Sequence, residues 1–171
     1  HADVLVNHAG VGGTTPAELE TMERWRSTMA VNLDGLFLLS QQVGLGMIER
    51  GHGSIVNIAS ILGLVGSAPI KQAAYCASKG AVVNLTRELG AQWGRKGVRV
   101  NAIAPGWFMS ERTEQDMFGD DSSMEFIRRN APMGRAGEEH ELDGALLFLA
   151  SNASTYVTGQ TIAVDGGWTA R

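Results

Sequence analysis

The sequence predicts an α/β fold with a doubly wound parallel sheet, and two observations support this prediction. Short apolar runs rich in β-branched residues alternate with long stretches of helical periodicity across the 171 residues. That alternation is typical of βαβ units joined by right-handed crossovers. The short runs are apolar throughout rather than every second residue, as in strands that are covered on both faces. We therefore expect a single domain over residues 1–171, with helices on both sides of the sheet.

Four apolar runs read as buried strands, and they cover residues 4–6, 54–59, 98–104 and 160–164. The first run is followed by Asn7 and Gly10, and the third is broken by Pro105-Gly106. Such turn residues end strands abruptly because they favour conformations that a ladder does not accommodate.

Helical periodicity predicts helices over about residues 19–50, 73–93, 123–129 and 138–150. In the first stretch Trp25, Met29 and Leu33 recur at helical spacing, and Gly51 follows as a stop signal. Between the third strand and the last helix, residues 107–137 are mainly irregular and polar.

Composition places the chain among ordinary globular proteins, with 44% hydrophobic and 19% charged residues. A net charge of −4 gives no reason to expect nucleic acid or an anionic membrane surface as a partner. No apolar stretch approaches the ~20 residues of a membrane span, and the four histidines lack metal-ligand spacing. Cys76 is the only cysteine, which fits a cytoplasmic protein. We expect it to be a small filler on its helix, although its neighbour Tyr75 leaves a catalytic role open.

Three predicted strand ends carry polar or turn residues that could form one site. Asn7 to Gly10, Ser60 and Pro105-Gly106 each follow the carboxyl end of a predicted strand. Ligands of open parallel sheets bind in the crevice outside these ends. The helix that bears Tyr75 and Lys79 follows the second of them, so we expect all these groups to face one crevice.

Tyr75 and Lys79 lie four positions apart, only ~40° from each other around a helix. An unperturbed tyrosine has a pKa of about 10 and is a poor base at neutral pH. A neighbouring cation favours the phenolate and lowers that pKa toward the range of efficient acid–base work. By itself the pair is common, and the ordinary interpretation is a packed ring beside a solvated amine.

Further motifs stand in a fixed order along the chain: Asn7-His8-Ala9-Gly10, Val31-Asn32-Leu33, Ser60, Tyr75 with Lys79, Pro105-Gly106, Val157-Thr158-Gly159-Gln160 and Val164-Asp165-Gly166-Gly167. In this order and spacing they resemble the classical short-chain dehydrogenase/reductase family over essentially the whole chain. The resemblance implies a Rossmann-like fold and hydride transfer between NAD or NADP and a small alcohol or carbonyl substrate.

The resemblance also implies roles for four catalytic residues. Tyr75 donates or accepts the proton on the substrate oxygen, and Lys79 lowers the pKa of Tyr75 and binds the nicotinamide ribose. Ser60 holds and polarises the substrate oxygen. Asn32 anchors a water that links Lys79 to the bulk solvent.

The resemblance assigns a second set of residues to the cofactor, and these are Asn7, Ala9, Gly10, Tyr75, Lys79, Pro105, Gly106, Phe108 and Ser110. In this set Phe108 offers its backbone amide to the carboxamide, and Ser110 lies near the phosphates. Asn7 and Gly10 are equally well explained as a turn alone.

One family feature is absent from this sequence. No glycine-rich turn follows a first strand and opens a helix, although such a turn brings backbone amides to the pyrophosphate. We expect this turn, the residue that selects NAD or NADP, and the first three strands to lie upstream of His1. The 171 residues alone should then bind dinucleotide poorly and expose a sheet edge.

Two other functions stay open. One is an epimerase or dehydratase of the same superfamily, and the other is a non-catalytic fragment that forms oligomers. The helices around Met29 and Leu85 resemble family surfaces that build homo-oligomers, either tetramers or dimers. Residues 106–137 correspond to the family's substrate lid. Their apolar residues with Arg112, Arg128 and Arg129 would suit a hydroxy acid or sugar acid, unless the arginines are simply solvated.

Overall fold

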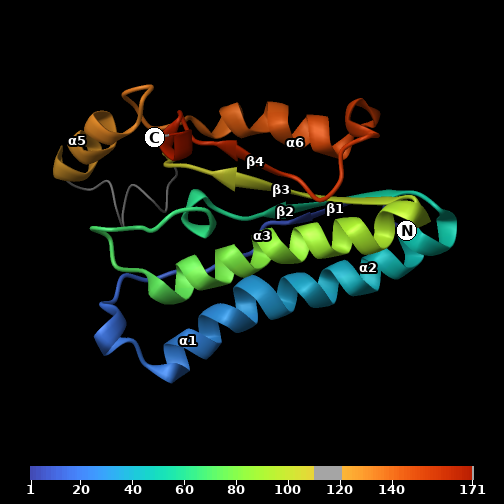
Figure 1. The fold of residues 1–171 in the computed structure, drawn as a ribbon, viewed down its shortest axis with the longest axis horizontal. Helices are drawn as coiled ribbons and strands as arrows, with labels where there is room; N and C mark the ends of the chain where they lie inside the picture. Colours follow the sequence, from blue (N-terminus) through green and yellow to red (C-terminus); the bar gives the residue numbers. More distant parts are fainter. Residues whose placement is uncertain (110–120, 171) are drawn as a thin grey trace.

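A four-stranded parallel sheet forms the centre of the molecule (Figure 1). The structure is a computed structural model and describes residues 1–109 and 121–170. The strands are β1 (Val4–Asn7), β2 (Gly53–Ile58), β3 (Val98–Pro105) and β4 (Thr161–Val164), and they lie in the order β1-β2-β3-β4. All neighbouring pairs are parallel, which confirms the predicted fold class.

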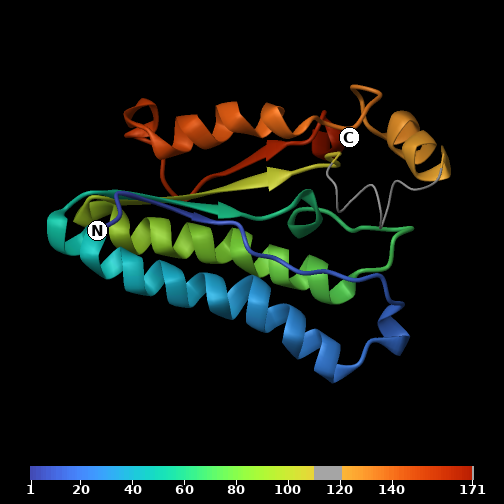
Figure 2. The same ribbon diagram turned by 180° about the vertical axis from the view of Figure 1, so that it is seen from behind.

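Helices cover both faces of this sheet, as the two opposite views show (Figures 1 and 2). On one face lie α1 (Met22–Met29), α2 (Leu36–Arg50) and α3 (Ala73–Trp93). On the other lies α6 (Asp143–Ala150), with α5 (Asp121–Asn130) toward the carboxyl end of the strands. Among the helices of the described residues, none is long and apolar enough to cross a membrane.

The two-sided cover explains why the strands are apolar at consecutive positions. Ile55 packs with Met47 and Trp93 in the cluster beneath α2 and α3, whereas its neighbour Val56 packs with Leu149 of α6. Ile55 and Val56 are both fully buried. Each face of the strand therefore buries apolar area, at about 25 cal/mol per Å².

The long helix predicted over residues 19–50 is interrupted in the structure. A short 3₁₀ turn covers Ala17–Leu19, and α1 begins at Met22 after Thr21, whose side chain accepts a hydrogen bond from the backbone N–H of Arg24. A π-helix, Ala30–Gly35, then separates α1 from α2. Hydrophobic periodicity does not reveal such a widened turn, because it inserts one residue without ending the helix.

A buried chain of polar side chains ties the sheet to the helices below it. The Asn7 amide donates hydrogen bonds to Ser40 Oγ and Asn57 Oδ1, each at 2.9 Å. Asn57 in turn donates to Thr86 Oγ1 at 2.9 Å. These residues belong to β1, α2, β2 and α3, so the chain fixes the layers against one another at the depth where the strands end.

Candidate active site

Ser60 lies directly beyond the carboxyl end of β2. Strand β2 ends at Ile58, and Ser60 caps a 3₁₀ turn, Ile61–Gly63, in which its Oγ accepts a hydrogen bond from the N–H of Leu62 at 3.1 Å. The side chain is buried. This bond orients the hydroxyl while the strand end fixes the backbone, so the Ser60 side chain is held by its own segment of the chain.

Tyr75 and Lys79 lie in the first turns of α3, which begins at Ala73. The Lys79 ammonium stands 5.7 Å from the centroid of the Tyr75 ring. Its nitrogen also donates a hydrogen bond to the carbonyl oxygen of Ile58 at 2.7 Å. Ile58, the last residue of β2, therefore holds the Lys79 ammonium, and Ser60 follows Ile58 by two positions. Ser60, Tyr75 and Lys79 thus lie near the same strand end.

Burial changes the chemistry of this lysine. Lys79 is 4% exposed, and desolvation lowers the pKa of its ammonium from 10.5 to about 8. At neutral pH most of the population still carries the positive charge. A cation in a poorly solvated position acts strongly on a nearby phenol, because little water screens the interaction.

Asn32 lies in the π-helix and is fully buried. Its Oδ1 accepts a hydrogen bond from the N–H of Val11, and its amide donates to the carbonyl of Val11 and to Ser78 Oγ, at 2.8, 2.8 and 2.9 Å. Both amide hydrogens are therefore taken by protein acceptors. The role predicted for Asn32 requires a water that donates to one of its oxygen atoms.

The segment after β1 packs against the tyrosine and the lysine at two glycines. A Cβ atom at Gly10 would lie 3.4 Å from the Lys79 ammonium nitrogen, and one at Gly12 would lie 3.0 Å from Cδ2 of Tyr75. A side chain at Gly12 would press on the Tyr75 ring, whereas a Cβ atom at Gly10 would make an ordinary van der Waals contact with Lys79. The neighbouring Ala9 is exposed, whereas the Asn7 side chain points into the core, so only the backbone of Asn7 could face a cofactor.

The turn after β3 is fixed by the carboxyl end of β4. The N–H of Gly106 donates to the carbonyl of Val164 at 2.9 Å, and a Cβ atom at Gly106 would lie 2.7 Å from the Cα of Asp165. Phe108 follows in this turn, and its ring covers Gly137. Pro105, Gly106 and Phe108 thus stand at the same edge of the sheet as Ser60. Ser110, the other residue predicted here, lies outside the described residues.

An apolar cluster adjoins Tyr75. Its buried members are Ile61, Leu62, Ile127, Ala131, Ala136 and Trp168, and Tyr75, Cys76, Trp107, Met109, Met124 and Phe126 pack against it. Trp107 and Trp168 meet edge to face with ring centroids 5.5 Å apart. Cys76 packs here among apolar side chains, as a small filler does. The cluster forms an apolar wall on one side of the half-buried Tyr75 side chain.

Three residues of this site were not predicted. Val11 and Ser78 hold Asn32, and Gly63 brings the turn after Ser60 against α3, where a Cβ atom would lie 2.6 Å from the backbone carbonyl of Lys79. Their place in the chain gives one weak signal: Ser78 directly precedes Lys79 and Gly63 follows Ser60 closely. Their contacts, however, join segments far apart in sequence.

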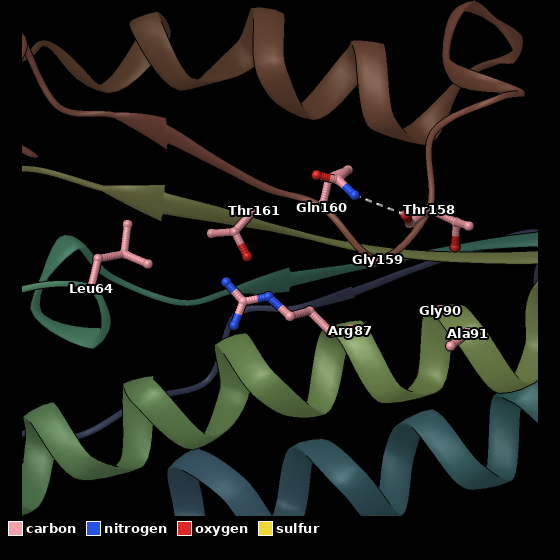
Figure 3. A pocket seen from close by; sticks show the side chains of 8 residues that line it. All are labelled: Leu64, Arg87, Gly90, Ala91, Thr158, Gly159, Gln160 and Thr161. Carbon is pink, nitrogen blue, oxygen red and sulfur yellow. Dashed lines mark hydrogen bonds between the residues drawn. The ribbon is translucent and has the colours of Figure 1, made fainter. Parts of the chain in front are cut away.

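The larger of two described cavities lies away from these residues. It measures about 450 Å³ and is open to solvent between α3 and the start of β4 (Figure 3). It is lined by Leu64, Arg87, Gly90, Ala91, Thr158, Gly159, Gln160 and Thr161, and none of the predicted site residues is among them.

The parallel sheet with helices on both faces, and with Ser60, Tyr75 and Lys79 near the carboxyl end of β2, is a Rossmann-like α/β fold. The family model described as enoyl-(acyl carrier protein) reductase matches residues 1–169. The chain belongs to the classical short-chain dehydrogenase/reductase family, as its motifs indicate.

Named relatives share most of this chain. It is 44% identical over 169 residues to 2-dehydro-3-deoxy-D-gluconate 5-dehydrogenase of Bacillus subtilis (strain 168), and the match covers 99% of this chain and 65% of the relative. It is 48% identical over 167 residues to galactitol 2-dehydrogenase (L-tagatose-forming) of Cereibacter sphaeroides, over 97% of this chain and 65% of the relative. The chain thus spans about two thirds of the length of these curated relatives.

A solved structure matches the same region. The gluconate 5-dehydrogenase of Burkholderia cenocepacia J2315, in complex with NADP and tartrate, superposes with a TM-score of 0.93 and 41% identity. The match covers 99% of this chain and 65% of that one. At this level of identity the likeness extends to the family, beyond the architecture alone.

Proposed function

We propose that this chain supplies the proton-transfer residues of an NAD(P)-dependent oxidoreductase that interconverts an alcohol and a carbonyl compound. The observation that carries the proposal is the buried Lys79 ammonium, held by Ile58 at the end of β2 and 5.7 Å from the Tyr75 ring. Such a pair, beside the Ser60 hydroxyl and an apolar wall, suits proton transfer to an oxygen atom.

Each residue has a distinct task in the proposed reaction. In the direction of reduction, Tyr75 gives its phenolic proton to the carbonyl oxygen as that oxygen becomes a hydroxyl. Ser60 donates a hydrogen bond to the same oxygen and orients it, and Lys79 stabilises the phenolate that remains. A bound nicotinamide supplies the hydride to the carbon in this direction and accepts it in the other.

The described residues fit a dinucleotide at the edge where the strands end. Gly10 and Gly12 lack side chains, so the backbone after β1 lies close against Lys79 and Tyr75, and Ala9 beside them is exposed. We assign the nicotinamide half of the cofactor to Ala9, Gly10, Pro105, Gly106 and Phe108, with Ser110 toward the phosphates. Lys79 would bind the ribose, and NAD and NADP both suit this half.

The substrate we propose is a small polyol or sugar acid with a secondary alcohol. The support comes from relatives and solved structures that are named for gluconate and galactitol. In this proposal the lid predicted over residues 106–137 closes over the substrate. Residues 110–120 of it lie outside the described residues, and its described part contributes Trp107 and Ile127 to the wall beside Tyr75.

An assay of the intact enzyme with NAD⁺ or NADP⁺ and a panel of sugar acids and polyols tests this function. We expect reduced nicotinamide to form with at least one of these alcohols. If every alcohol in the panel, and every corresponding ketone in the reverse direction, gave no turnover with either cofactor, the proposed substrate class would be wrong.

An exposed apolar helix face supports a second proposal, that the chain forms a homo-oligomer. Leu38 and Leu45 of α2 are 56% and 54% exposed, and residues seven apart share one helix face. Apolar side chains exposed together in this way mark association surfaces. We expect Leu45→Glu to reduce the mass measured by light scattering. An unchanged mass would argue against association through this face of α2.

A further inference from the structure

Ser78 occupies a fully buried position between Asn32 and Tyr75. Its hydroxyl accepts a hydrogen bond from the Asn32 amide at 2.9 Å and donates one to the backbone carbonyl of Tyr75 at 2.8 Å. One small side chain therefore joins the π-helix to the first turn of α3.

The bond to Tyr75 alone would be unremarkable, because serines inside helices often donate to a carbonyl three or four residues earlier. The bond from Asn32 is different. It comes from another element, 46 positions away in sequence. It also uses the second amide hydrogen of Asn32, whose remaining bonds hold Val11.

The same segment reaches Tyr75 a second time, at its ring. Gly12 follows Val11, and a Cβ atom at Gly12 would lie 3.0 Å from Cδ2 of Tyr75. The contacts therefore form a closed loop that runs from the Val11 backbone through Asn32 and Ser78 to the Tyr75 backbone, and returns from the Tyr75 ring to Gly12. Movement of the tyrosine relative to this segment would have to break one of these contacts.

We infer that Ser78 is a positioning residue, whose hydroxyl fixes the Tyr75 phenol at its working distance from Lys79 by tying the start of α3 to Asn32. The inference rests on the proposed function only in that Tyr75 is there the proton donor. Removing the hydroxyl leaves an amide hydrogen of Asn32 buried without an acceptor and frees the first turn of α3. The phenol then loses its fixed place beside the ammonium.

Titration of the Tyr75 phenol tests this inference without any turnover. These 171 residues contain two tyrosines, and Tyr156 is fully exposed. In a Tyr156→Phe background, the tyrosinate absorbance that disappears when Tyr75 is also replaced by Phe reports Tyr75. We expect Ser78→Ala to raise the pKa of Tyr75 by about one unit, toward the ordinary value of about 10. Ser78→Cys keeps the size but bonds weakly, and the pKa should rise there too.

Ser54→Ala is the matched control. Ser54 is a buried serine of β2 whose hydroxyl donates to the carbonyl of Leu149 at 2.8 Å, on the far side of the sheet. It should leave the pKa of Tyr75 unchanged although it also removes a buried hydrogen bond. An unchanged pKa in both Ser78 variants, or an equal rise in Ser54→Ala, would overturn the inference. If the pKa of Tyr75 rose in the Ser78 variants but the protein with Ser78 intact had no dehydrogenase activity, the proposed function would be contradicted and the positioning role of Ser78 would stand.

Discussion

The environment of Lys79 differs clearly from that of an ordinary surface lysine. Its ammonium is buried and donates to a backbone carbonyl at the end of β2. Desolvation lowers its pKa to about 8, because the charged form loses water that one carbonyl only partly replaces. At neutral pH the buried charge therefore lowers the free energy of unfolding, while it places a cation near Tyr75.

This cost should appear as pH-dependent stability. In a Tyr75→Phe protein, where no phenolate can form beside Lys79, the unfolded chain keeps the Lys79 proton between about pH 8 and 10.5 and the folded chain loses it, so the free energy of unfolding rises with pH by up to about 3 kcal/mol. Lys79→Met should abolish this contribution. Urea unfolding below and above this window measures it, in a Tyr75→Phe background so that the phenol does not titrate too. An equal rise in the Lys79→Met protein would show that Lys79 is not its source.

The short turn after Ser60 and helix α3 pack closely enough that their backbones meet. A Cβ atom at Gly63 would lie 2.6 Å from both the carbonyl carbon and the oxygen of Lys79. Backbone atoms cannot move aside as the end of a flexible side chain can. This contact holds the distance between the segment with Ser60 and the helix with Tyr75.

Gly63→Ala should therefore push the turn away from α3. We expect it to lower the free energy of unfolding by about 1–3 kcal/mol and to reduce kcat in the intact enzyme, because Ser60 moves relative to Tyr75. Gly66→Ala is the control, since a Cβ atom there meets nothing within 4 Å. If the two variants matched in stability and kcat, the close packing at Gly63 would not be what positions Ser60.

Among the elements, the strands were predicted to within about a residue at each end, and the helix boundaries less well. Residues 54–59 and 98–104 were expected where β2 (Gly53–Ile58) and β3 (Val98–Pro105) occur. Buried parallel strands have this accuracy because both of their faces are apolar. The π-helix at Ala30–Gly35 could not be predicted from apolar periodicity, and the Asn32 side chain within it bonds to partners 21 and 46 positions away.

At the scale of the whole molecule, the residues of the candidate site converge because parallel strands direct all their carboxyl ends to one edge. The residues on the strand ends could be predicted from this rule alone. The residues that support them could not, because Ser78 and Gly63 act through contacts between α3 and segments distant in sequence.

The candidate site and the larger described cavity lie at different places on the sheet. The cavity between α3 and β4 holds Arg87 and Thr161 (Figure 3), away from Ser60 and Tyr75. We place the proposed chemistry at the carboxyl edge of the sheet, because the hydroxyl of Ser60, the phenol of Tyr75 and the buried ammonium of Lys79 lie there.

The most direct test of this account is steady-state turnover of the intact enzyme with and without the Tyr75 hydroxyl. Tyr75→Phe keeps the ring packed against Gly12 and removes only the hydroxyl that we propose transfers the proton. General acid–base catalysis contributes about 10²–10⁴-fold, so kcat should fall by at least about a hundredfold while the fold, followed by circular dichroism, is retained. Unchanged alcohol oxidation and carbonyl reduction by the Tyr75→Phe enzyme would contradict the central claim that Tyr75 is its proton donor and acceptor.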